Sequence, residues 1–229
     1  MFSTLRNRYV CGYRNIIGQP YAGDSGSHEP TGNAVDTTNG AGPHNLQIFI
    51  MNADGVVLHC LAGFWNSADL AGELELAERL DRVWNDRSIL PDQKLALFKR
   101  MQMDHVNFHS SDMVARSRLQ SFDKRFEFEA RQRSSDVIAN ASLIDSRDSH
   151  PYLPDEAFKT TDRLMHERIA ARPFVLYDNF DVAKFADYGT MFYDKHENNM
   201  DEFGQMIDGE AKMTTIKSGM RNWAPPAPR

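Results

Sequence analysis

Two cysteines are the nucleophiles that this sequence offers for redox chemistry. Cys11 lies between Arg8 and Arg14, and a nearby cation lowers the pKa of a thiol and raises its thiolate fraction. Cys60 lies in the apolar run 56–61, where a free cysteine packs as a small hydrophobic side chain. The sequence contains no C-x-x-C pair. Cys11 is therefore the candidate nucleophile, with a purely structural role as the alternative.

The histidines do not form a recognisable metal-binding motif. His166 is followed by Glu167, but the second histidine of an H-E-x-x-H zinc motif is missing. His105 and His109 are four residues apart and share one helix face, yet two ligands do not complete a site, so we expect a solvated helix end. A separate metal-site hypothesis uses side chains in and around a glycine-rich loop. Its candidate ligands are Cys11, His28, His44 and His59.

The first part of the chain must position these residues on strands. Residues 8–17 are rich in β-forming side chains and predict a strand, which a long glycine-rich connection over 18–43 follows. Residues 46–51 and 56–61 predict two buried antiparallel strands. The turn Asp54-Gly55 between them supplies the positive-φ residue that a tight hairpin needs.

Helices follow. Ser67 is the expected N-cap of a helix over 68–84, whose apolar residues recur every three or four positions. Pro91 begins a second helix that runs to Met103. Three further segments complete the expectation. They are a helix from Ser110 or Ser111 to about Arg133, a helix over 155–171, and an irregular segment over 174–193 that aromatic rings anchor.

The order of elements in residues 46–84 resembles the C-terminal half of a thioredoxin fold. A buried strand, an Asp-Gly turn, an antiparallel strand, Gly63 and an amphipathic helix follow one another there. Residues 8–17 resemble the parallel strand that precedes them in that family. The resemblance implies an α/β fold: a partial thioredoxin-like βββα layer, then a helical extension and an irregular aromatic-rich tail. In one register the C-x-x-C strand and helix would lie upstream of this chain; in the other, Cys11–Arg14 is a degenerate single-thiol motif.

Three regions are expected along the 229 residues. Residues 1–85 would form the thioredoxin-like domain, truncated at its N-terminus in the first register, and 86–175 the helical extension. Residues 176–229 would form the irregular segment and a proline-rich tail. The tail begins to differ in composition from about Asn198, where glycine, methionine and polar residues dominate.

Composition narrows the classes of function. The net charge of −6 and pI near 5.7 disfavour a dedicated nucleic-acid binder, which needs clustered cations. No apolar run is long enough for a transmembrane helix, and no secretory signal is visible, so we expect a cytoplasmic protein. The phosphate-binding and dinucleotide-binding glycine motifs are also missing, so no cofactor is expected.

Three functions remain open. The resemblance implies thiol–disulfide or peroxide chemistry, degenerate here, with Cys11 as nucleophile, Arg14 lowering its pKa and His44 near the substrate groove. Without a resolving thiol, turnover would need an external thiol such as glutathione. The second function is a non-enzymatic scaffold that binds a protein partner or forms a homo-oligomer. The third is the metal-binding protein of the glycine-rich loop.

Overall fold

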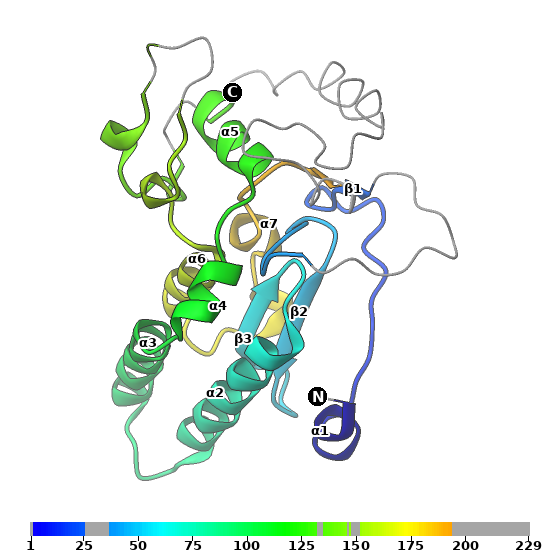
Figure 1. The fold of residues 1–229 in the computed structure, drawn as a ribbon. Coiled ribbons are helices and arrows are strands. Elements are labelled where there is room, and N and C mark those ends of the chain that lie inside the picture. The colour runs from blue at the N-terminus through cyan, green and yellow to red at the C-terminus, as the bar shows by residue number, and fades with distance from the viewer. Residues whose placement is uncertain (1, 26–36, 132–134, 146, 148–151, 194–229) are drawn as a thin grey trace.

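A two-stranded antiparallel hairpin lies at the centre of the structure, between helices (Figure 1). The computed structural model describes residues 2–25, 37–131, 135–145, 147 and 152–193. Strand β2 (Gln47–Met51) pairs with β3 (Val57–Ala62), with a bulge at Ile50/Met51. The Asp54-Gly55 turn joins the strands, and Gly55 has a φ of 78°. The hairpin confirms the expectation for 46–61.

Helices surround this hairpin. Both α2 and α6 contact β3, and α3 packs against α2 and α6 (Figure 1). The helices are α1 (Phe2–Arg8), α2 (Ser67–Asn85), α3 (Pro91–Asn107), α4 (Ser111–Arg116), α5 (Ser121–Glu129), α6 (Thr161–Ala170) and α7 (Val182–Phe185). Short 3-10 turns are η1 (Ala141–Leu143), η2 (Asp155–Ala157) and η3 (Tyr177–Asn179). A second, short sheet pairs β1 (Asp24–Ser25) in parallel with β4 (Phe192–Tyr193). The fold thus mixes helix and sheet.

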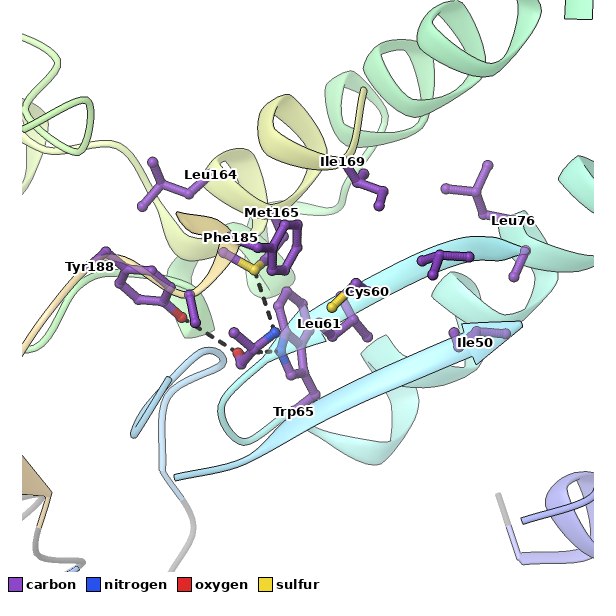
Figure 2. Packing of buried hydrophobic residues seen from close by; sticks show 14 of the residues in the cluster. Ile50, Cys60, Leu61, Trp65, Leu76, Leu164, Met165, Ile169, Phe185 and Tyr188 are labelled. Carbon is purple, nitrogen blue, oxygen red and sulfur yellow. Dashed lines mark hydrogen bonds between the residues drawn. The ribbon is translucent and has the colours of Figure 1, made fainter. Parts of the chain in front are cut away.

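The core forms where β3 meets α6 and the aromatic segment near residue 185 (Figure 2). Every residue of β3 is buried. The backbone of Ala62 is a junction: its N–H donates to Met165 Sδ at 3.4 Å, and its carbonyl accepts from Trp65 Nε1 at 3.0 Å. Tyr188 lies in the same core and donates to the Gly40 carbonyl at 2.8 Å. Rings of the 174–193 segment therefore anchor it, as expected.

The predicted strand over 8–17 is wrong. Helix α1 ends at Arg8, and residues 9–16 form neither helix nor strand. Val10, Tyr13 and Ile17 are exposed to solvent. A strand is stabilised by neighbours that pair its backbone and cover its side chains, so β-forming residues alone do not create one. In the described residues, the βββα layer is reduced to a hairpin followed by α2.

Three helix boundaries also differ from expectation. Asn66, rather than Ser67, caps α2, because Asn66 Oδ1 accepts from the Ala68 N–H at 2.9 Å. The expected helix from Ser110 or Ser111 to about Arg133 is divided, within the described residues, into α4 and α5. The expected helix over 155–171 begins as η2 and becomes α6 only at Thr161, because Phe158 is extended and forms a β-bridge with Ile138. Ser110, one of the two predicted caps, caps α4: its Oγ accepts from the Met113 N–H at 3.2 Å.

Candidate metal centre

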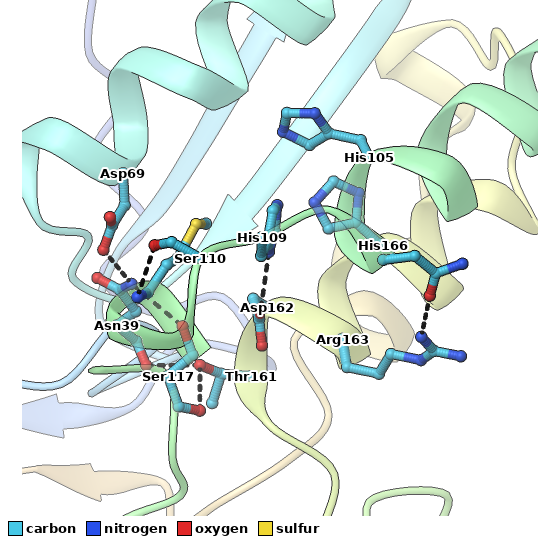
Figure 3. A network of polar contacts seen from close by, with 12 residues as sticks. Asn39, Asp69, His105, His109, Ser110, Ser117, Thr161, Asp162, Arg163 and His166 are labelled. Carbon is cyan, nitrogen blue, oxygen red and sulfur yellow. Dashed lines mark hydrogen bonds and ion pairs between the residues drawn. The ribbon is translucent and has the colours of Figure 1, made fainter. Parts of the chain in front are cut away.

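Four metal-ligating side chains from three helical regions meet beside the core. Glu73 lies on α2, His105 on the last turn of α3, and His166 on α6. His109 follows the end of α3, where the His109 N–H still donates to the Val106 carbonyl at 3.3 Å. The end of α3 thus holds His109 beside His105, with ring centroids 4.9 Å apart (Figure 3).

A polar network aligns the ends of the helices that carry these ligands (Figure 3). Asn39 Nδ2 donates to Asp69 Oδ2 at 2.8 Å in the first turn of α2. Arg116, at the end of α4, forms two hydrogen bonds with the same carboxylate, at 2.7 and 2.9 Å. Thr161, at the start of α6, donates to the Asn39 carbonyl at 2.6 Å. One asparagine therefore couples α2 to α6.

The donor atoms converge on one point. Glu73 Oε2 lies 3.4 Å from His105 Nε2, and Glu73 Oε1 lies 3.3 Å from His109 Nε2. His166 Nε2 is 3.3 Å from the same carboxylate. One donor atom from each of the four residues lies within 4.8 Å of the others. Ligands on a tetrahedral ion at bond lengths of about 2.1 Å would be roughly 3.4 Å apart, so the spacing around Glu73 suits an ion.

The centre is buried on all but one side. The side chains of Glu73 and His166 are 0% exposed, that of His109 is 4% exposed and that of His105 is 17% exposed. Among the described residues, Glu73 Oε2, His59 Nε2 and His109 Nε2 make no hydrogen bond of acceptable geometry, although ion-pair contacts of 3.0 and 3.3 Å join these histidines to Glu73. A buried polar atom without a partner costs about 1–3 kcal/mol. A cation bound among the four donor atoms would satisfy Glu73 Oε2 and His109 Nε2.

Partners behind two of the rings determine which nitrogen faces the centre. His109 Nδ1 lies 2.7 Å from Asp162 Oδ2, and His166 Nδ1 lies 2.6 Å from Gln102 Oε1. Both partner atoms accept hydrogen bonds, so each ring carries a proton on Nδ1. The lone pair on Nε2 of a neutral ring is then free for a metal.

His59 supports Glu73 from the sheet side. Its Nε2 lies 3.0 Å from Glu73 Oε2, and its ring stacks on that of His166 with centroids 5.0 Å apart. Gln102 Nε2 lies 3.4 Å from His59 Nδ1 and donates to it, so the proton of a neutral His59 is on Nε2, facing Glu73. His59 Nε2 is thus in ion-pair contact with the carboxylate, although the two atoms do not form a hydrogen bond of acceptable geometry.

Electrostatics favour an ionised carboxylate. Burial opposes ionisation of Glu73, but His166, His105 and His109 outweigh it and hold the pKa of Glu73 well below its usual value. Burial also opposes protonation of His109, but Asp162 and Glu73 raise its pKa to about 9. Burial lowers the pKa of His166 to about 4, so this ring is neutral at pH 7. His109 is thus the cation that balances Glu73 when no metal is bound.

The residues predicted from the sequence as a redox site lie elsewhere. Cys11 is exposed, and Arg14 Nη1 lies 3.5 Å from Tyr177 Oη. His44 is buried, and its ring nitrogens contact the carbonyls of Tyr21 and Tyr188 at 3.3 and 3.2 Å. In the part of the chain that the structure describes, no hydrogen bond or ion pair joins Cys11, Arg14 and His44.

The two predictions about metal ligands need correction. His105 and His109 do not lie at a solvated helix end, because packing of α6 against α3 covers them. In the glycine-rich-loop hypothesis, His28 lies outside the described residues. Its other members are dispersed: Cys11 is exposed, His44 contacts Tyr21 and Tyr188, and only His59 adjoins the centre.

Comparison with known proteins adds no family to this description. No family model matches the chain, and no curated protein or solved structure matches it significantly. No helix in the described ranges is both long and apolar enough to cross a membrane. Function is therefore inferred from the geometry of the centre.

Proposed function

We propose that this protein binds one divalent transition-metal ion within the cluster of Glu73, His105, His109 and His166. The observation that carries the proposal is the convergence of four donor atoms within 4.8 Å in a nearly closed site. Nitrogen donors with one carboxylate suit zinc, iron or cobalt, whereas magnesium and calcium prefer oxygen ligands throughout. The structural alternative is an ion-pair network alone, in which protonated His109 balances Glu73. The lack of well-aligned hydrogen bonds at Glu73 Oε2 and His109 Nε2 favours a bound ion over that alternative.

Metal titration tests the proposal directly. Protein treated with a chelator should bind one equivalent of Zn²⁺ in calorimetry, and one equivalent of Co²⁺ should give visible absorption bands. Glu73→Gln removes the charged ligand and should weaken binding by at least about 100-fold, more than the loss of an outer partner does. Glu75→Gln is the matched control, because Glu75 is exposed on the same helix.

Circular dichroism must show that both variants keep their helices. Absence of stoichiometric binding to the unmodified protein would overturn the proposal, as would equal affinities of Glu73→Gln and Glu75→Gln. The comparison of Glu73→Gln with Glu75→Gln removes an effect of net charge, because both substitutions change the net charge equally.

Thiol chemistry and the scaffold function stay predictions of the sequence. Burial raises the pKa of the Cys60 thiol well above its usual value, so Cys60 resists becoming a thiolate. Any thiol reaction would therefore depend on Cys11, which is exposed.

A further inference from the structure

The three histidines of the centre differ in what contacts Nδ1, the ring nitrogen on the side away from Glu73. His109 and His166 face acceptors, Asp162 and Gln102, through short contacts of 2.7 and 2.6 Å. His105 Nδ1 instead lies 3.3 Å from Arg79 Nη2. A guanidinium has donors and no lone pair, so His105 Nδ1 accepts this hydrogen bond.

The contact with Arg79 gives His105 the opposite tautomer. A neutral His105 that accepts on Nδ1 carries its proton on Nε2, the atom 3.4 Å from Glu73 Oε2. To bind a metal through Nε2, His105 would have to release that proton or move it to Nδ1 and break the contact with Arg79. His109 and His166 need no such rearrangement of their neutral forms.

Solvent exposure also distinguishes His105 from the other three residues of the centre. Glu73, His109 and His166 are enclosed, whereas His105 is the most exposed of the four and Arg79 is exposed beside it. The three enclosed donors form a set of two histidines and one carboxylate. Such sets, with three protein ligands, leave coordination positions open for an exogenous ligand.

We infer that Glu73, His109 and His166 hold the ion, and that His105 donates its Nε2–H to a small anion at an open position on the ion. This inference rests on the proposed metal-binding function. Glu73 and Asp162 offset the two charges of the ion, so Arg79 adds positive charge at the rim. That charge favours an anionic ligand over a neutral one. The site would therefore accept small anions from the solvent side.

Cobalt loading and azide titration separate the two roles of histidine. His166→Ala should weaken Co²⁺ binding by at least about 100-fold, whereas His105→Ala should retain one equivalent with an affinity within about threefold. Azide should shift the visible spectrum of the Co²⁺-loaded protein. His105→Ala should then bind azide about tenfold more weakly, because it loses one hydrogen bond to a charged group.

Variants of Arg79 test the tautomer. Arg79→Ala should weaken azide binding, whereas Arg79→Lys should restore it, because a lysine can also donate to Nδ1. Arg82→Ala, on the exposed part of the same helix, controls for the lost charge and should bind azide as the unmodified protein does. His105→Gln is a second variant in case His105→Ala misfolds, and circular dichroism compares the helix content of the two variants.

Two results would overturn this inference while leaving the proposed function intact. One is loss of Co²⁺ from both His105 variants as severe as that from His166→Ala, which would make His105 a ligand. The other is a Co²⁺ spectrum that azide does not change. Failure of the unmodified protein to bind Co²⁺ at all would overturn the proposed function itself.

Discussion

The far nitrogen of each imidazole decides what a histidine in this centre can do. Where Nδ1 donates to a carboxylate or an amide oxygen, as in His109 and His166, Nε2 of the neutral ring keeps a lone pair on the side of Glu73. Where Nδ1 accepts from a guanidinium or an amide nitrogen, as in His105 and His59, Nε2 of the neutral ring carries the proton on the side of Glu73. Identical side chains therefore divide into ligands and hydrogen-bond donors.

Asp162 should strengthen metal binding without touching the ion. Its carboxylate accepts from His109 and makes that ring a better donor. Asp162→Asn should weaken Zn²⁺ binding about tenfold, which is the lower end of the effect of losing a residue that hydrogen-bonds to a metal ligand. Calorimetry measures the change, with Asp104→Asn on the exposed face of α3 as control. Equal affinities of the two variants would contradict the assigned role of Asp162.

A buried carboxyl outside the centre predicts how stability depends on pH. Burial, and secondarily Glu127, raise the pKa of Asp123 to about 7, although the Thr190 N–H donates to its carboxylate. In the unfolded chain Asp123 loses its proton near pH 3.9. Between these values the folded state holds more protons, so the free energy of unfolding decreases as the pH rises.

Asp123→Asn removes this dependence. Relative to the unmodified protein, the variant should gain on the order of 2–4 kcal/mol in unfolding free energy between pH 4 and pH 7. Urea denaturation at several pH values measures the difference. Glu129→Gln, exposed on the same helix, should show no such gain. Parallel pH profiles for Asp123→Asn and the unmodified protein would refute the raised pKa.

At the scale of elements, α2 serves the core and the centre with one face. Leu74, Leu76, Ala77 and Leu80 are buried, and Glu73 is buried beside them. The hairpin contacts this helix through both β2 and β3, and α3 also packs against it. The N-terminal cap of α2 therefore helps to set the position of a metal-binding carboxylate.

The observed cap of α2 can be distinguished from the predicted one. Asn66→Ala should lower the free energy of unfolding by about 1 kcal/mol, because the Ala68 N–H loses its acceptor. Ser67→Ala should have a smaller effect, because Ser67 is the first residue of the helix and not its cap. Urea denaturation of both variants provides the comparison. A larger loss from Ser67→Ala would show that the cap is misassigned.

At the scale of the whole molecule, one core joins segments that are distant in sequence. It contains residues from Ile50 on β2 to Tyr188, and it includes Leu164, Met165 and Ile169 of α6 (Figure 2). Cys60 lies inside this core, whereas Cys11 is exposed. The two thiols therefore report on the surface and on the core respectively.

Thiol counting should detect this difference. An aromatic disulfide reagent should modify one thiol rapidly in the native protein and two in guanidinium, because Cys60 reacts only after unfolding. Cys11→Ser should leave no rapidly reacting thiol in the native state. Rapid reaction of two native thiols would contradict the burial of Cys60.

Local patterns predicted local structure, and packing determined the rest. The hairpin and α2 follow from apolar runs, an Asp-Gly turn and helical spacing, all within about forty residues. The strand over 8–17 failed because it needed a distant partner. The centre was missed because Glu73 and His166 are 93 positions apart, and only α2, α3 and α6 packing joins them. A usable signal was present: Glu73 and His166 each directly adjoin a buried apolar residue of their helix, Leu74 and Met165.

The position of the centre also affects how the chain survives in a cell. An ion held at once by α2, by the end of α3 and by α6 would link these three elements and oppose their separation. Binding to the folded state alone adds about 2.7 kcal/mol of stability when the free ion exceeds its dissociation constant a hundredfold. Metal starvation would therefore shorten the lifetime of this protein by exposing it to proteolysis, whether or not the metal takes part in a reaction.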